Sequence, residues 1–203
     1  MAVLIAACGS STSSDSNEKA GTYKVAVTDA SFPTKQFIGQ TSLMQIDVKN
    51  TGDKTVPTLI VTVDVEGEEG KEARIPFAIH DPQVGLAGPD RPVWVLAATY
   101  PRLVGSSEPG GAETSNAKTY SFGPLEPGKS VEAVWKLSAV RAGKYTIGYE
   151  VGAGLNSEAK AKTSSGVPPG GTFVADITTK LPDTEVNAAG EIVEIKQGGK
   201  SGR

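Results

Sequence analysis

The clearest indication of the fold is the segment Arg141-Ala142-Gly143-Lys144-Tyr145-Thr146-Ile147-Gly148-Tyr149-Glu150-Val151. From Tyr145 to Val151 every second residue is apolar, and the residues between are polar or glycine. Side chains alternate between the two faces of a β-strand, so this pattern predicts a strand with one buried face. Gly143 precedes it closely enough to form a corner.

The same two-residue period recurs along the chain, at 23–28, 44–49, 59–66, 131–138 and 172–177. Each segment has one apolar and one polar face, which is typical of antiparallel sheets with one solvated side. Two such sheets would bury their apolar faces against each other. We therefore expect an all-β fold, an antiparallel β-sandwich with a long insert after its third strand. The segment 156–163 is expected to be a short strand or loop.

Composition agrees with this fold and excludes several functions. The 203 residues include 24 Gly and 13 Pro, which favours turns over long helices. The net charge of −3 provides no basic excess for phosphates, so we expect no nucleic-acid partner. One Cys and one His are too few for a disulfide or a Cys/His zinc site. We expect no metal and no cofactor.

Three short motifs resemble those of immunoglobulin-like (Ig-like) domains. Tyr145 matches the tyrosine corner of that family, and Ile147 stands where antibody domains have a cysteine. The strand end at 48–52 and the turn at 125–130 resemble those of bacterial extracytoplasmic Ig-like domains, including those described as cell-adhesion-related. The resemblance implies a sandwich without the inter-sheet disulfide, in which Ile147 contacts Met44 or Ile46. It implies little about function, because such folds serve many roles.

The beginning of the chain resembles a lipoprotein signal. Leu4-Ile5-Ala6-Ala7-Cys8 is similar to the lipobox of bacterial lipoproteins, in which the cysteine is lipidated. The resemblance implies a truncated signal peptide and lipobox at 1–8, and a lipid on Cys8 that holds the protein at the extracytoplasmic side of the cell membrane. The pattern departs from that family, because no Lys or Arg precedes Cys8. The alternative is a disordered N-terminus with an incidental thiol.

We divide the rest of the chain by composition. Residues 9–21 are rich in Ser and predict a flexible tether. Residues 22–196 form the single Ig-like domain, with a Pro-punctuated insert at 67–118 that contains short edge strands at 75–81 and 91–96. Residues 181–189 are expected to be irregular, 191–196 a possible last edge strand, and 197–203 a disordered tail.

The insert holds the candidate binding residues Trp94, His80 and Tyr100, because long loops on rigid β scaffolds often bind partners. Trp94 is interpreted either as core or as an exposed anchor, and Trp135 as core. His80 and Asp81, with Ser106 or Ser107, would suggest a hydrolase, but a solvated histidine explains them better. The acidic residues at 64–69 lack calcium-loop spacing and are interpreted as a solvated edge.

Three functions remain open. The first is a lipid-anchored, non-catalytic binding or adhesion module whose partner is another protein or an envelope polymer. The second is a structural spacer or accessory subunit of an envelope complex. A secreted hydrolase is a remote third.

Overall fold

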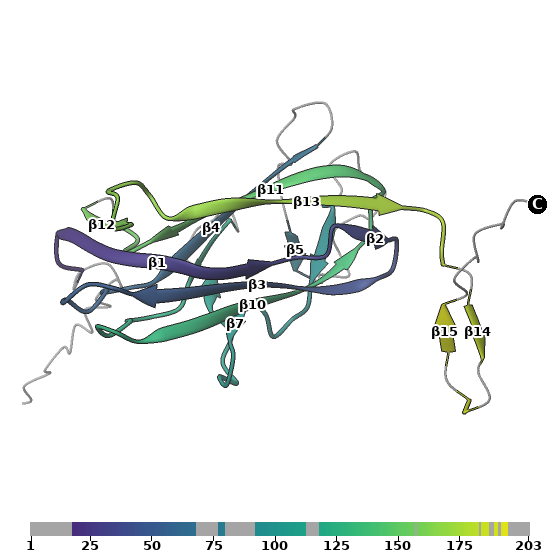
Figure 1. Ribbon diagram of the computed structural model, residues 1–203, viewed down its shortest axis with the longest axis horizontal. Helices are drawn as coiled ribbons and strands as arrows, with labels where there is room; N and C mark the ends of the chain where they lie inside the picture. The colour runs from purple at the N-terminus through teal and green to yellow at the C-terminus, as the bar shows by residue number, and fades with distance from the viewer. Residues whose placement is uncertain are drawn as a thin grey trace, which may run out of the picture.

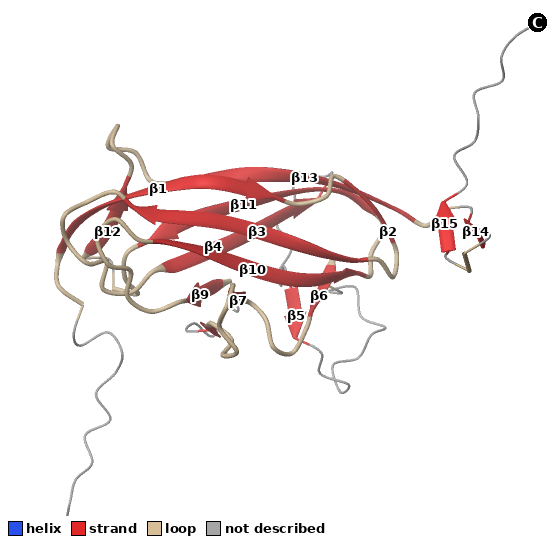
Figure 2. Ribbon diagram, turned by 60° about the horizontal axis from the view of Figure 1, so that its bottom comes forward, coloured by secondary structure: helices blue, strands red, loops and turns tan. Residues whose placement is uncertain are grey.

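Apart from a two-stranded sheet near the C-terminus, the strands of this protein lie in two stacked sheets (Figures 1 and 2). The computed structural model describes residues 18–67, 77–79, 92–112, 118–156, 158–182, 184–186, 189–190 and 192–194. The first sheet runs in the order β12 (Ala159–Lys162), β1 (Gly21–Ser31), β3 (Thr41–Asn50), β10 (Ser130–Ala139), β6 (Trp94–Leu96) and β5 (Phe77–Ile79), with β7 (Arg102–Leu103) also paired to β10.

The second sheet covers the apolar face of the first. Its order is β2 (Lys35–Phe37), β13 (Gly170–Thr178), β11 (Gly143–Gly152), β4 (Ile60–Gly67), β9 (Thr119–Ser121) and β8 (Gly111–Ala112). The predicted all-β sandwich is therefore confirmed, and each of the alternating segments is a strand.

The expectation of purely antiparallel sheets was wrong at three places. β1 pairs in parallel with β12, β13 with β2, and β6 with β5. All three pairs involve short strands, and none is joined by a tight hairpin that would force an antiparallel arrangement. Hydrophobic alternation places a strand on a sheet but does not fix its direction, so the sequence could not reveal these pairs.

The core lies between the two sheets and contains the apolar positions of every alternating segment. Met44, Ile46 and Ile147 are fully buried and belong to one core cluster. Each such side chain contributes about 1.5–3 kcal/mol by leaving water. Ile147 thus occupies apolar surroundings where antibody domains place a disulfide. Trp135 is also fully buried, as expected.

The tyrosine corner is present. The Tyr145 hydroxyl donates a hydrogen bond of 3.0 Å to the carbonyl of Ala142. Gly143 has a φ of 143°, and a Cβ there would lie 2.9 Å from the Tyr145 hydroxyl oxygen. A side chain at position 143 would therefore displace the corner. Burial raises the pKa of Tyr145, although Arg141 partly lowers it, so the phenol stays a proton donor at neutral pH.

Asn50 joins the two turns that carry the Ig-like resemblance. It is fully buried at the end of β3, and its Nδ2 donates to the carbonyls of Lys54, at 2.9 Å, and Leu125, at 2.8 Å. Its Oδ1 accepts from the backbone N–H of Gly52 at 3.0 Å. A buried amide with these partners holds the 51–54 loop against the 125–129 turn.

The N-terminal segment is ordered earlier than the sequence predicted. The carboxylate of Glu18 accepts hydrogen bonds from the backbone N–H groups of Leu155 and Asn156, at 2.9 and 3.0 Å. Tyr23 donates to the carbonyl of Lys19 at 2.8 Å, and β1 begins at Gly21. Residues 18–21 are therefore part of the sandwich rather than of the tether. The remainder of the tether, 9–17, lies outside the described residues.

The described part of the insert belongs to the sheets. The expected strands at 75–81 and 91–96 are present as β5 and β6, but β6 is not an edge strand, because it lies between β10 and β5. β4 lies between β11 and β9, but β9 pairs only with its first residues, 60–62, so within the described residues 64–66 have a ladder partner on one side alone, as a solvated edge requires. Asp64 and Glu66 are exposed, and Asp64 forms an ion pair of 3.0 Å with Lys118.

Trp94 connects the insert to both sheets. Its indole is fully buried and makes edge-to-face contacts with Phe32, Phe77 and Tyr145. Its Nε1 donates to Oε1 of the buried Gln36 at 2.9 Å. The exposed-anchor interpretation of Trp94 is therefore wrong, and the core interpretation is confirmed. Its neighbours along the chain could not reveal this, because the ring is covered by residues distant in sequence.

The C-terminal region forms a separate hairpin. Among the described strands, β14 (Thr184–Val186) and β15 (Ile192–Glu194) pair only with each other, beyond the end of β13 (Figure 1). The strand expected near 191–196 is present, but it is not an edge of the sandwich. The segment 181–189, expected to be irregular, contains β14. The tail at 197–203 lies outside the described residues.

Replacing Trp94 by Ala should destabilise the fold by about 3–5 kcal/mol, because a large cavity would open between the sheets. Urea unfolding followed by fluorescence or circular dichroism measures the change. The matched control is Val104→Ala, at a side chain that is 61% exposed, which should cost less than about 0.5 kcal/mol. Equal losses for the two variants would contradict the assignment of Trp94 to the core.

Candidate functional site

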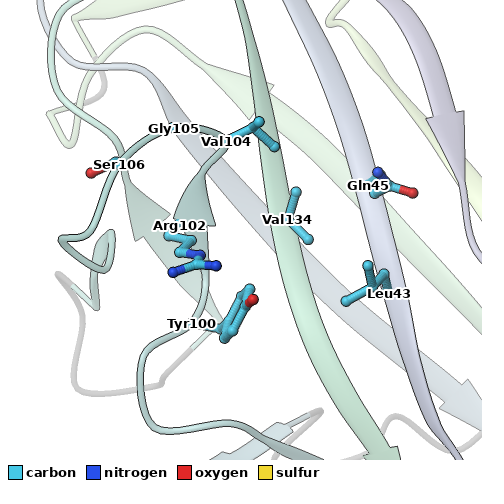
Figure 3. Close-up of a pocket in the computed structure, with 8 residues that line it drawn as sticks. All are labelled: Leu43, Gln45, Tyr100, Arg102, Val104, Gly105, Ser106 and Val134. Carbon is cyan, nitrogen blue, oxygen red and sulfur yellow. The ribbon is translucent and has the colours of Figure 1, made fainter.

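An open groove of about 320 Å³ lies on the outer face of the first sheet. It is bounded by β3 and β10 on one side and by the segment that carries β7 on the other (Figure 3). Its lining residues are Leu43, Gln45, Tyr100, Arg102, Val104, Gly105, Ser106 and Val134. The groove is thus lined by aliphatic side chains together with an aromatic ring, a guanidinium, an amide and a hydroxyl.

Strand register brings these side chains together. Arg102 pairs with Val134, and Val134 pairs with Gln45 on β3. Residues paired in this way point to the same face of a sheet, so their side chains form one row across β7, β10 and β3. Val134 is 94% covered although it faces outward, and its ladder partners on the two sides are Arg102 and Gln45.

Tyr100 and Arg102 form the polar wall of the groove. The backbone N–H of Tyr100 donates to the carbonyl of Ala97 at 2.9 Å, which closes a turn after β6. The guanidinium carbon of Arg102 lies 4.6 Å from the centre of the Tyr100 ring, within the range of a cation–π contact. Arg102 makes no ion pair with any other described residue, so its planar donor groups are available for a ligand.

A row of three carboxylates crosses the sheet beside the groove. Asp47 pairs with Asp29 on β1 and with Glu132 on β10. The Gln45 side chain donates a hydrogen bond of 2.5 Å to Glu132. Burial raises the pKa of Asp47, and the charges of Glu132 and Asp29 raise it further. The carboxylates therefore place negative charge one row along the strands from Arg102, which carries a positive charge.

The structure brings one of the predicted binding residues into this groove. Tyr100 lines it, Trp94 lies in the core between the sheets, and His80 falls outside the described residues. Cys8 and Asp81 also fall outside them. Ser106 lines the groove, but its hydroxyl donates to the carbonyl of Glu108 at 3.2 Å and accepts from the same residue's N–H at 3.1 Å.

Sequence reasoning missed Arg102, Gln45 and Leu43. The alternation at 44–49 did place Gln45 on the polar face of a strand, which is the only signal that pointed to it. Nothing in the chain near Arg102 marks it as functional, because its position depends on pairing with β10, distant in sequence. Leu43 is 43% exposed, an apolar side chain on a face expected to be polar.

The described residues offer no other site with a comparable set of side chains. A second depression of about 240 Å³ adjoins the first and is lined by Ser106, Glu108 and Phe122 among others. Within the described ranges, no three His, Cys, Asp or Glu residues are placed to hold a metal ion. The described part of the chain also contains no helix long and apolar enough to cross a membrane.

Comparisons with known proteins give structural likenesses alone. No protein-family model matches the chain, and no curated protein matches it either. Similar solved structures include the CARDB domain of a Pyrococcus furiosus protein, with 13% identity, a TM-score of 0.44, and coverage of 77% of this chain and 96% of that one. BslA, described as a bacterial hydrophobin, has 11% identity, a TM-score of 0.42, and coverage of 78% and 97%.

A third likeness is to a small part of a much larger protein. The trypsin-activated alpha-2-macroglobulin of Escherichia coli has 13% identity and a TM-score of 0.39, with coverage of 81% of this chain but 9% of that one. At these identities and scores the likenesses concern the β-sandwich arrangement and carry nothing about ligands. The site must therefore be interpreted from its own geometry.

Replacing Asp47 by Asn should stabilise the protein at neutral pH, because the folded state disfavours the charged carboxylate. The gain should be small, about 0.5 kcal/mol, because solvent screens partly exposed charges. The raised pKa of Asp47 means that the folded state favours the protonated form. Its contribution is thus fully present below the unfolded value of 3.8 and is lost as pH rises through the higher folded pKa. Asp47 therefore contributes a decrease in the free energy of unfolding as pH rises. When that free energy is measured from pH 3 to pH 7, this decrease should be absent in Asp47→Asn. The exposed Asp53→Asn is the control, and an equal change there would refute the explanation.

Proposed function

We propose that this protein is a lipid-anchored, extracytoplasmic binding or adhesion module of the bacterial cell envelope, and that it is non-catalytic. The observation that carries the binding role is the groove between β3, β10 and the β7 segment. It combines an exposed apolar surface with an arginine held on a tyrosine ring. Sites with this mixture bind ligands by apolar contact and orient them with a few polar groups.

The scaffold supports such a role because the groove residues are held by strand pairing. Leu43, Gln45 and Val134 lie on the two long central strands, whose inner faces are fully buried. Arg102 is fixed by its ladder to Val134. A ligand therefore meets side chains whose backbone is already ordered, which lowers the entropic cost of binding. The partner that we propose is a protein or an envelope polymer.

The anchor is proposed on the lipobox-like sequence before Cys8. Ten peptide units separate Cys8 from Glu18, the first residue held to the sandwich. At full extension this length spans about 35 Å. The end of the sandwich that carries Glu18, Asn50 and Gly154 would then face the membrane. The groove, on the outer face of the first sheet, would point sideways, parallel to the membrane.

Replacing Cys8 by Ala should release the protein from the membrane, because the thiol is the proposed site of lipid attachment. Fractionation of cells into membrane and soluble pools, with labelled fatty acid fed to the culture, measures both anchor and lipid. Replacing the exposed Ser164 by Ala provides a control that should leave both unchanged. Membrane association that survives Cys8→Ala without label would disprove the anchor.

Replacing Tyr100 and Arg102 together by Ala should reduce retention of the protein on isolated cell-envelope fragments by about tenfold, because the polar wall of the groove is lost. The full chain carrying Cys8→Ser is used, so that no lipid contributes. Arg102→Ala alone covers the case in which loss of the Tyr100 ring disturbs folding, and Arg141→Ala is the matched control at an exposed corner. Unchanged retention of both groove variants would refute the binding role.

One observation favours the spacer alternative. The N-terminal segment leaves the sandwich near Gly21, whereas β13 leads to the C-terminal hairpin from the opposite end (Figure 1). A chain that enters at one end and leaves at the other can separate two attachments. This alternative predicts that the groove variants bind the envelope as well as the original protein. The remote hydrolase reading rests on His80, and loss of a measured hydrolysis in His80→Ala would be needed to support it.

A further inference from the structure

The groove face has a fixed order of charges along its strands. Lys136, beside Leu43, and Arg102, beside Val134, occupy two successive rows. The next row along the strands carries Glu132, Asp47 and Asp29. Neighbouring outward positions on a strand are two residues apart, about 7 Å. The face therefore presents two rows that each carry a basic side chain and then an acidic row, at the spacing of the β repeat.

The charges of the basic and acidic rows are not cancelled by pairing with one another. Neither Arg102 nor Lys136 forms an ion pair with a described residue. Glu132 instead accepts a hydrogen bond from the neutral Gln45 amide, and Asp47 keeps a raised pKa beside Glu132 and Asp29. An occupant with a negative group on the Arg102 side and a positive group on the Glu132 side would satisfy both rows.

Apolar groups define the ends of the same surface. Leu43 is 43% exposed beside Lys136, and Val104 is 61% exposed beside Glu132, whose carbonyl accepts the Val104 N–H at 2.9 Å. An apolar side chain of the occupant can therefore cover Leu43 while its charged groups meet the next two rows. Along the surface the rows therefore carry Leu43 with Lys136, then Arg102, then the carboxylates.

We propose that the groove binds an extended peptide segment whose side chains alternate with the same period as the strands beneath it. Every second residue of an extended peptide points to one face and recurs at about 7 Å, which matches the row spacing. The segment would carry an apolar residue over Leu43, an acidic residue two positions on beside Arg102, and a basic residue two further beside Glu132 and Asp47. This inference rests on the proposed binding role of the groove and names the chemistry of its partner.

The test uses defined peptides and the full chain carrying Cys8→Ser. The probe is acetyl-Thr-Val-Thr-Glu-Thr-Lys-Thr-amide with a fluorescent label, and binding is measured by anisotropy up to about 1 mM, since a short peptide binds weakly. In the control peptide the lysine directly follows the glutamate, which puts the two charges on opposite faces. We expect the control to bind roughly tenfold more weakly, as charge-assisted hydrogen bonds of this kind predict.

A charge reversal sharpens the test. Arg102→Glu should lower the affinity for the probe by roughly tenfold or more. The variant should instead prefer a peptide with lysine in place of the glutamate, because the Arg102 row then becomes negative like the row of Glu132 and Asp47. Arg141→Glu reverses a charge at an exposed corner and should change neither affinity. Circular dichroism and thermal unfolding confirm that both variants fold.

The outcomes separate the two proposals. Equal binding of probe and control, no binding of the probe, or an Arg102→Glu variant with unchanged preference would overturn the peptide assignment. If envelope retention still depends on Tyr100 and Arg102 in that case, the binding role stands and the partner has another chemistry. If retention is also independent of the groove, both proposals fail.

Discussion

The buried indole of Trp94 is the contact on which the arrangement of the groove depends. It packs against Phe32, Phe77 and Tyr145, which belong to different parts of the two sheets, and it donates to Gln36 at 2.9 Å. Because both the ring and its N–H are satisfied inside the core, β6 is held beside β10. Directly after β6, the N–H of Ala97 donates a hydrogen bond of 3.0 Å to the carbonyl of Lys136 and keeps the chain beside β10. The chain then turns at Tyr100 and pairs Arg102 with Val134 on β10.

An internal contact therefore determines an external surface. The outer faces of β3 and β10 carry Leu43 and Gln45, but they form a groove only because the β7 segment stands beside them. The same registers align Asp29, Asp47 and Glu132 in one row, where burial and like charges raise the pKa of Asp47. This row has an electrostatic cost in the isolated molecule, and a positively charged occupant would relieve that cost.

Most of the sandwich could be predicted from local pattern, and most of the groove could not. Alternation located β1, β3, β4, β10, β11 and β13, because a half-buried strand must show it. The corner at Gly143 and Tyr145 was also predicted, since it depends on residues that are adjacent in sequence. Trp94 could be assigned either to the core or to the surface, because Val93 and Val95 on either side of it indicate no face. Arg102 gave no signal, because its role arises from pairing with a strand about thirty residues away.

Local patterns in the sequence were sufficient to predict an all-β sandwich without an internal disulfide, held together by its apolar faces and its turns. Alternation, glycine and proline positions and the single cysteine are local properties, and each has a direct physical consequence for the backbone. The tertiary structure decided which strands run in parallel, where Glu18 attaches the N-terminal segment, and which side chains share one face. Those features depend on backbone pairing between distant segments, whose register a single chain of letters does not state. The groove, with its positive and negative rows, exists only once that register is set.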